Sequence, residues 1–149
     1  MNRLNWIRSP RETTAAVVGF CKTVKFGRPL KKATLTVSAI GVYIPFVDGV
    51  RVGRNVMAPG WTSYRNRVQY RSYDVTDLIR SGSTVEIEVG QGWAVGYIGY
   101  ANTNHFFSDH TSLNAELTLI FDSGREKKIV TDETWDVYTT PVQIGRAHV

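Results

Sequence analysis

The chain has 149 residues, 42% of them hydrophobic, and its 18 Lys and Arg residues outnumber 13 Asp and Glu residues, which gives a net charge of +5. This length is typical of one globular domain, and the single cysteine, Cys21, excludes an intramolecular disulfide framework or a cysteine-cluster zinc site. No apolar run reaches the ~18 residues of a membrane span, and residues 1–10 lead into no apolar signal core. We therefore expect a chain that is neither inserted in a membrane nor exported, with the cytoplasm as its default compartment.

The first regular pattern is an alternation of apolar and polar residues from Ala33 to Ala39. Side chains of a strand point alternately to its two faces, so this period of two predicts a strand with one wet face. Next, Asp48-Gly49 predicts a tight hairpin turn between Tyr43–Val47 and Val50–Val52, because Gly tolerates the positive φ that the turn requires. Pro45 cannot donate a hydrogen bond to a neighbouring strand, which predicts that its own strand lies at an edge or bulges there.

The second half of the chain continues the strand pattern. Asp74–Arg80 alone has a helical pattern, and its seven residues predict a single turn with Asp74 or Thr76 as the cap. Val85–Val89 alternates again, and so does Leu113–Leu119, after which Asp122-Ser123-Gly124 predicts a hairpin turn back along Lys128–Thr131. About eight strands and no long helix predict an all-β fold, a β-sandwich of the jelly-roll type.

Two long segments interrupt these strands, Gly53–Arg67 and Gly90–His110. Both are rich in aromatic residues, Gly and Asn, and both are longer than ordinary connections. Binding residues often lie on such loops because a rigid scaffold holds them in place. We therefore expect the functional site on these two loops.

Most of the chain resembles the N-terminal domain of bacterial α-L-rhamnosidases. The similarity runs from about Val18 to Tyr138 and rests on motifs in one order: Lys32-Ala33-Thr34-Leu35-Thr36-Val37-Ser38-Ala39-Ile40-Gly41-Val42-Tyr43, Asp48-Gly49-Val50-Arg51-Val52-Gly53, Met57-Ala58-Pro59-Gly60-Trp61-Thr62-Ser63-Tyr64, Arg67-Val68-Gln69-Tyr70-Arg71-Ser72-Tyr73-Asp74-Val75-Thr76-Asp77-Leu78-Ile79 and Gly90-Gln91-Gly92-Trp93. The resemblance implies a galactose-binding-like jelly roll that accompanies a separate (α/α)₆ catalytic barrel, which this chain lacks. It further implies a parent enzyme that hydrolyses terminal α-L-rhamnosyl groups, and rhamnose binding with the help of calcium in some members.

The resemblance also divides the chain into three parts. Residues 1–14 are expected to be a lead-in, residues 15–143 the sandwich, and residues 144–149 a tail that does not continue the family pattern. Two interpretations of this tail stay open, a non-native extension and a sandwich truncated at its C-terminal strand.

The sequence departs from the family at the place where calcium would be expected. Related sequences carry an acidic residue where this chain has Arg54-Asn55. Calcium takes several oxygen ligands, carboxylates foremost, and a guanidinium removes one ligand and repels the ion. We therefore expect no cofactor, with a calcium site near Asn55 as the less favoured alternative.

No catalytic machinery is expected within the chain. An inverting glycosidase needs two carboxyl groups roughly 6.5–9.5 Å apart, whereas Glu86 and Glu88 have the pattern of a solvated strand face. Asp132-Glu133 are neighbours whose side chains point to opposite faces. His105 and His110 match no metal-ligand spacing. The chain is therefore predicted to be an inactive fragment of a glycoside hydrolase.

Carbohydrate binding requires a flat aromatic ring for the C–H face of a pyranose and polar groups that match its hydroxyls. The residues predicted to supply them lie on the two loops: Trp93, Trp61, Asn55, Asn102 and Asn104. Trp93 is the favoured platform, and the Asn amides both donate and accept hydrogen bonds. Each type has a structural alternative, since Trp can pack in a core and Asn can form a turn. Trp6 and Trp135 lie outside the loops and are expected to pack.

Two other functions stay open. Four residues are predicted to share one strand face: Arg67, Gln69, Arg71 and Tyr73. A cationic groove with stacking rings binds single-stranded nucleic acid, so this face is the basis of one alternative. A purely structural module that docks against the catalytic barrel is the other. The favoured partners are rhamnose-containing glycans and that barrel, with no nucleic acid and no membrane.

Overall fold

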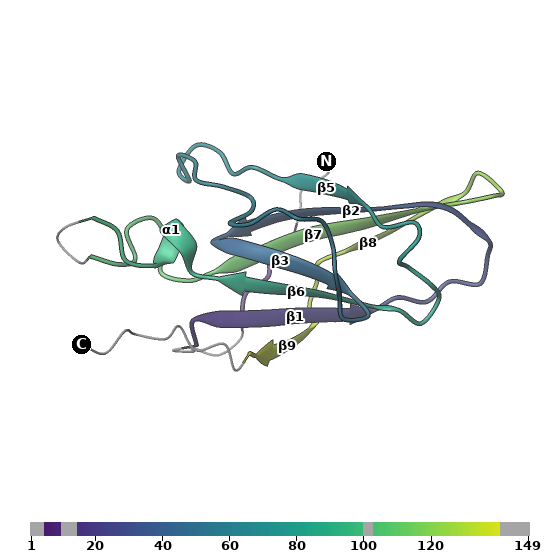
Figure 1. Ribbon diagram of the computed structural model, residues 1–149, viewed down its shortest axis with the longest axis horizontal. Coiled ribbons are helices and arrows are strands. Elements are labelled where there is room, and N and C mark those ends of the chain that lie inside the picture. The colour runs from purple at the N-terminus through teal and green to yellow at the C-terminus, as the bar shows by residue number, and fades with distance from the viewer. Residues whose placement is uncertain (1–4, 10–14, 100–102, 141–149) are drawn as a thin grey trace.

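A computed structural model describes residues 5–9, 15–99 and 103–140, and in it the chain forms two antiparallel β-sheets that face each other (Figure 1). The elements are β1 (Val17–Thr23), β2 (Leu30–Ile40), β3 (Val42–Val47), β4 (Val50–Arg51), β5 (Arg71–Asp74), β6 (Thr84–Gly90), α1 (Gly92–Val95), β7 (Ser112–Phe121), β8 (Glu126–Val130) and β9 (Asp136–Thr139). One sheet has the order β4-β3-β6-β1-β9 and the other β5-β2-β7-β8. The all-β sandwich is confirmed, and this strand order is compatible with a jelly roll. The predicted tail, residues 144–149, lies outside the described residues.

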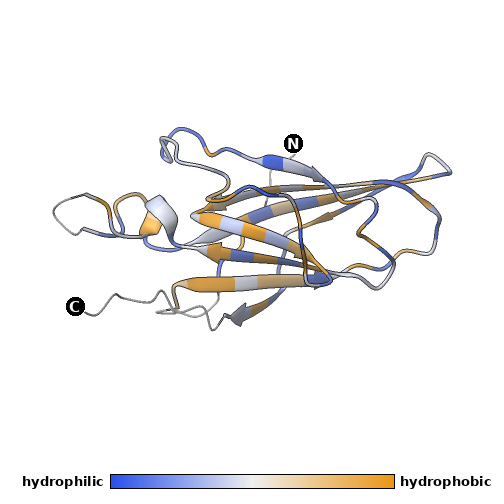
Figure 2. Ribbon diagram, in the orientation of Figure 1, coloured by the Kyte–Doolittle hydropathy of each residue, from blue (hydrophilic) through white to orange (hydrophobic). Residues whose placement is uncertain are grey.

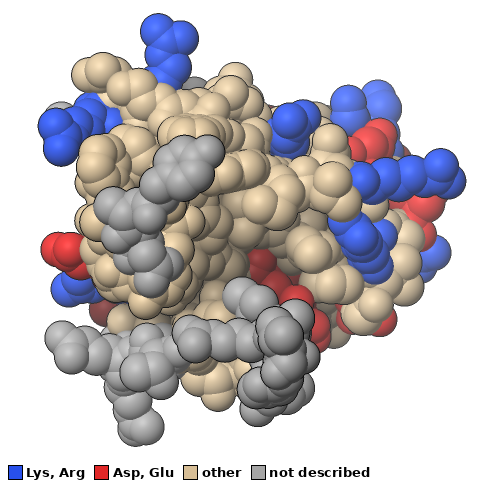
Figure 3. All heavy atoms as spheres, turned by 60° about the vertical axis from the view of Figure 1, so that its left-hand side comes forward, with Lys and Arg blue, Asp and Glu red and all other residues tan. Residues whose placement is uncertain are grey.

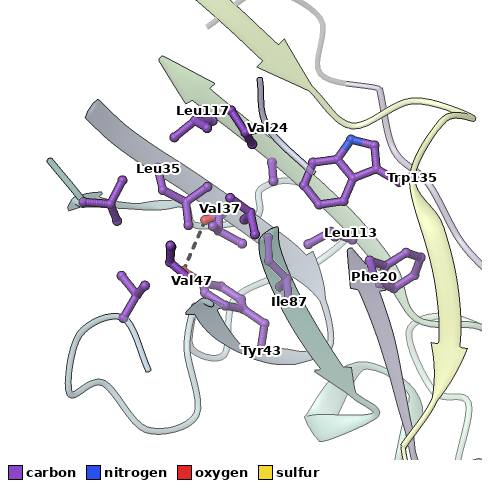
Figure 4. Close-up of a cluster of buried hydrophobic side chains, with 14 of the residues drawn as sticks. Phe20, Val24, Leu35, Val37, Tyr43, Val47, Ile87, Leu113, Leu117 and Trp135 are labelled. Carbon is purple, nitrogen blue, oxygen red and sulfur yellow. Dashed lines mark hydrogen bonds between the residues drawn. The ribbon is translucent and has the colours of Figure 1, made fainter. Parts of the chain in front are cut away.

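The core lies between the sheets because the alternation of the sequence gives each strand one apolar face. Val85, Ile87 and Val89 of β6 are buried, whereas Glu86 and Glu88 between them are only partly buried on the outer face. Figure 2 shows this alternation as changes of colour along the strands. Figure 4 shows side chains of both sheets meeting in the core. Full burial of one such Val, Leu or Ile side chain stabilises the fold by about 1.5–3 kcal/mol.

The predicted hairpin at Asp48-Gly49 is present. Asp48 has φ 49° and Gly49 has φ 77°, and Val47 pairs with Val50 across the turn. The Asp48 carboxylate accepts hydrogen bonds from the Ser83 hydroxyl (2.7 Å) and the Thr84 N–H (2.8 Å). These bonds lower the pKa of Asp48 and tie the hairpin to the start of β6.

The prediction for Pro45 is wrong in detail. Its strand β3 lies between β4 and β6, and the register with β6 runs through the Pro45–Ile87 pair without a shift. The Pro45 carbonyl accepts a hydrogen bond from the Val52 N–H (2.8 Å), so the side that lacks an N–H faces Val52. Since β4 ends at Arg51, the missing donor falls just beyond this short strand and breaks no ladder.

The segment around β5 differs from the prediction in its start. β5 begins only at Arg71, because the chain before it forms a turn in which the Arg67 N–H donates to the Ser63 carbonyl (2.9 Å). The sequence predicted that Arg67 and Gln69 share a strand face with Arg71. This prediction is wrong, because both residues lie before the strand begins. The turn after β5 is as predicted, and Asp74 caps it by accepting the Thr76 N–H (3.0 Å).

The two long loops lie at the same end of the sandwich. In Figure 1, α1 and the loop before β5 are both on the left, whereas the β7–β8 turn lies at the opposite end. The short helix α1 falls inside a segment predicted to be a loop. None of the helices found in the described ranges is long and apolar enough to cross a membrane.

Candidate functional site

Aromatic side chains from both long loops meet at this end of the sandwich. The rings of Trp61 and Trp93 stack, with centroids 6.0 Å apart and planes 15° from parallel. Phe107 contacts the Trp61 ring edge-on at 6.5 Å and the Tyr64 ring at 5.2 Å, and Phe106 packs on Phe107 at 4.9 Å. We call Trp61, Tyr64, Trp93, Phe106 and Phe107 the aromatic cluster.

The first loop is held in place by the sheet and by its own turn. The Tyr43 N–H of β3 donates to the Ala58 carbonyl (2.8 Å), which fixes the chain just before Trp61. The Thr62 hydroxyl then donates to the Arg67 carbonyl (2.7 Å) and closes the loop behind it. Trp61 is therefore anchored on both sides although its side chain is 53% exposed.

The second loop is held by α1. Gly92 has φ 52°, and a Cβ there would lie 2.7 Å from Cγ1 of Val42, so only glycine lets the helix start directly against β3. The Val95 carbonyl accepts the His105 N–H (2.8 Å), which folds the rest of the loop back over the helix. Trp93 on the helix and the two Phe residues of the loop are thereby brought to one place.

The outer surface of the aromatic cluster is open to solvent. Trp61 and Phe106 are exposed, whereas Trp93 and Phe107 beneath them are partly buried. Figure 3, in which this end of the molecule turns forward, shows uncharged residues over most of it and Lys and Arg toward the margins. Trp61 is thus the more accessible of the two stacked rings, and Trp93 supports it.

The Tyr64 hydroxyl is a buried polar group within the cluster. It has no hydrogen-bond partner within the part of the chain that the structure describes. Burial raises the pKa of Tyr64, so the hydroxyl keeps its proton and can both donate and accept. The surface that a ligand can reach is therefore formed by the exposed rings of Trp61 and Phe106, and not by this buried hydroxyl.

The predicted site residues have different outcomes. Trp61 and Trp93 are brought together, and Asn104 is exposed on the second loop, two residues before Phe106. Asn55 is exposed on the first loop, where its backbone carbonyl accepts a hydrogen bond from Arg51 (2.8 Å). Asn102 lies outside the described residues.

Three members of the aromatic cluster were not among the predicted carbohydrate-binding residues: Tyr64, Phe106 and Phe107. The signal that could have identified them is the density of aromatic residues in both loops. Trp135 packs in the core as predicted, with its indole N–H donated to the Val130 carbonyl (3.0 Å). Trp6 does not, because its side chain is 44% exposed.

The surroundings of Asn55 do not fit a calcium ion. The guanidinium of Arg51 holds the Asn55 carbonyl oxygen, and Arg54 adds a second positive charge next to it. A calcium site would require carboxylate and carbonyl oxygens at this place instead. Across the described residues, no three His, Cys, Asp or Glu side chains lie close enough together to hold a metal ion.

Comparison with solved structures shows the same architecture in glycosidases. The α-L-rhamnosidase of Aspergillus terreus matches 94% of this chain with a TM-score of 0.88 and 34% identity, and the match covers 17% of that enzyme. The α-L-rhamnosidase of Streptomyces avermitilis, crystallised with L-rhamnose, matches 86% of the chain with a TM-score of 0.80 and 32% identity, over 12% of its own length. A lectin from Pleurotus ostreatus shares the fold, with a TM-score of 0.63 at 19% identity.

Sequence comparison points the same way. The curated α-L-rhamnosidase of Streptomyces avermitilis is 34% identical over 77% of this chain, and one from Formosa agariphila is 31% identical over 85%. The chain spans only 11% and 14% of these two relatives. A family model described as the α-L-rhamnosidase N-terminal domain matches residues 28–148. The chain therefore belongs to the family of α-L-rhamnosidase N-terminal domains.

Proposed function

We propose that this domain recognises the sugar part of the substrate for an α-L-rhamnosidase and does not itself catalyse hydrolysis. The observation that carries the proposal is the stacked pair of Trp61 and Trp93, which joins the two long loops and leaves Trp61 exposed. The parent enzyme would hydrolyse terminal α-L-rhamnosyl groups with carboxyl groups of its catalytic barrel, outside this chain.

A rhamnose ring has one face of C–H groups and a rim of hydroxyls. We place the C–H face on Trp61, since a large flat ring offers apolar contact without a charge to desolvate. The Asn104 amide, which is exposed on the second loop, supplies a donor and an acceptor for the rim. Because Trp61 already stacks on Trp93, its side chain loses less conformational entropy when a ligand binds.

Non-catalytic action is supported by the carboxyl groups that the chain offers. Glu86 and Glu88 lie on the outer face of β6, whereas the aromatic cluster is formed by residues of the two long loops. Burial and the charge of Glu86 raise the pKa of Glu88. A raised carboxyl pKa also occurs at catalytic acids, so the absence of catalysis needs a direct test. We expect no turnover of an aryl α-L-rhamnoside by the chain purified free of host glycosidases. Turnover that is lost in Glu88→Gln would overturn this part of the proposal.

The binding part is tested by calorimetric titration of the full chain with L-rhamnose. We expect Trp61→Ala to weaken binding most, and Trp93→Ala to weaken it by removing the support. Tyr70→Ala is the matched control, because Tyr70 is an exposed aromatic residue with no ring contact among the described residues. Unchanged affinity in both folded Trp variants would exclude the aromatic cluster as the sugar site.

Docking against the rest of the parent enzyme is a second candidate function. It is favoured by further exposed apolar side chains on the same two loops, Val56, Met57 and Tyr97, in addition to Phe106 of the cluster. An apolar area of this kind often marks an interaction surface. In this case L-rhamnose would produce no binding heat. Single-stranded nucleic-acid binding is not favoured by the family, and its predicted arginine face does not form on β5.

A further inference from the structure

A second aromatic surface lies apart from the aromatic cluster. Asn5, Trp6 and Ile7 form one side of an open hollow of about 600 Å³, and Asp132, Glu133 and Thr134 form the other. None of these residues belongs to the aromatic cluster. Trp6 is 44% exposed here, whereas Trp135, which follows the hollow directly in sequence, is 7% exposed in the core.

The wall that carries Trp6 is fixed by backbone hydrogen bonds. Ile7 exchanges two of them with Leu113, at 2.9 and 2.8 Å, so the segment is joined to the start of β7 by an isolated antiparallel β-bridge. The Thr131 hydroxyl donates to the Asn5 carbonyl (2.6 Å). The backbone carbonyl of Asn5 is therefore engaged, whereas its exposed side-chain amide has no hydrogen bond to any residue that the structure describes.

The opposite wall is a polar turn. Oδ1 of Asp132 accepts hydrogen bonds from the N–H of Thr134 (2.9 Å) and from its hydroxyl, and Lys22 Nζ donates to the Thr134 carbonyl (3.2 Å) and hydroxyl. The Thr134 hydroxyl, its N–H and the Lys22 ammonium lower the pKa of Asp132. Asp132 is thus a fixed anion, and its Oδ2 accepts no hydrogen bond from the described residues.

We propose that this hollow is a second carbohydrate-binding subsite that takes one neutral pyranose ring. Trp6 is the stacking platform, and Asn5, which lines the same hollow, offers its amide as a donor and acceptor. Asp132 and Glu133 lie outside any strand and both line the hollow, although the sequence predicted opposite directions for their side chains. Their carboxylates accept hydrogen bonds from the hydroxyls of the pyranose and would repel an anionic sugar. The proposal rests on carbohydrate recognition as the function of the domain, but it does not require that the aromatic cluster binds sugar.

The test uses the indole N–H resonances of the full chain in two-dimensional ¹H–¹⁵N NMR, since each of the four tryptophans gives its own signal. Methyl α-L-rhamnopyranoside and methyl β-D-glucopyranoside serve as probes. We expect at least one of them to shift the Trp6 signal in a saturable way, while the core signal of Trp135 stays unchanged. The Trp61 signal reports the aromatic cluster separately.

Asn5→Ala and Glu133→Gln should weaken binding at Trp6 by roughly 2–10-fold each, the change expected for one hydrogen bond of about 0.5–1.5 kcal/mol. Asn104→Ala, on the second loop, should leave the Trp6 titration unchanged. A Trp6 signal that moves with neither sugar while Trp61 moves overturns this subsite and leaves the proposed function intact. Unmoved signals of both tryptophans overturn both. Unchanged affinity at Trp6 in Asn5→Ala and Glu133→Gln also overturns the subsite, because the contact is then non-specific.

Discussion

Asn114 offers a sharp test of how buried polar groups act in this sandwich. It lies on β7 opposite Ser38 of β2 and is 0% exposed. Neither Oδ1 nor Nδ2 has a hydrogen-bond partner in the described part of the chain. Ser38, by contrast, donates its hydroxyl to the Gln69 carbonyl (2.7 Å). One of two neighbouring buried polar side chains is therefore satisfied and the other is not.

The expected effect follows from this difference. An unpaired buried amide costs about 1–3 kcal/mol in proteins. Asn114→Val removes the amide, keeps a similar size and places a β-branched side chain on a strand, where it packs well. We expect it to raise the free energy of unfolding by about 1–3 kcal/mol, and the melting temperature by about 2–4 °C per kcal/mol. Asn114→Asp should do the opposite, because it buries an unpaired charge.

Thermal and urea unfolding of the two variants and the wild type provide the measurement. Ser38→Ala is the matched control at the neighbouring position, and it should lose about 1 kcal/mol because it leaves a carbonyl unpaired. The reasoning would be refuted if Asn114→Val were less stable than the wild type by as much as Ser38→Ala. That result would mean that the Asn114 amide forms a hydrogen bond in solution.

Three further predictions concern the same fold. Because its pKa is lowered in the folded state, Asp48 stabilises the fold fully above pH ~4, and this contribution is lost as the pH falls through the folded pKa. Asp48→Asn should therefore flatten the decline of the melting temperature below pH ~4. An unchanged pH profile would contradict the role of the hydrogen bonds to Asp48. Gly41→Ala should lower the free energy of unfolding far more than Gly124→Ala in urea unfolding. Both glycines have positive φ, but only at Gly41 would a Cβ lie 2.3 Å from a backbone oxygen. Equal losses of stability would show that the backbone conformation alone determines the cost. Trp135→Ala should cost about 3–5 kcal/mol in the same assay, and a loss below about 1 kcal/mol would mean that the core closes without it.

Local sequence was sufficient for most of the strands. The alternation in Ala33–Ala39 and Val85–Val89 predicted β2 and β6, because an extended strand is the regular conformation that places every second side chain on the same, buried face. Asp48-Gly49 and Asp122-Ser123-Gly124 predicted two hairpin turns, since turn geometry depends on the few residues within the turn. The aromatic loops were recognisable from their composition, and the family was recognised by its resemblance, through motifs that occur in a fixed order.

Tertiary structure decided what depends on partners far away in sequence. Trp61 and Trp93 stack because β3 fixes both loops: it binds the chain just before Trp61, and the start of α1, which carries Trp93, packs directly against it. Trp6 and Trp135 were both expected to pack in the core. Trp135 does so, whereas Trp6 is exposed next to the Ile7–Leu113 pairing, which holds its segment at the surface. Alternation tells which face of a strand is apolar, but the free energy that selects the neighbouring strand or loop arises only when the two sheets close over a shared core.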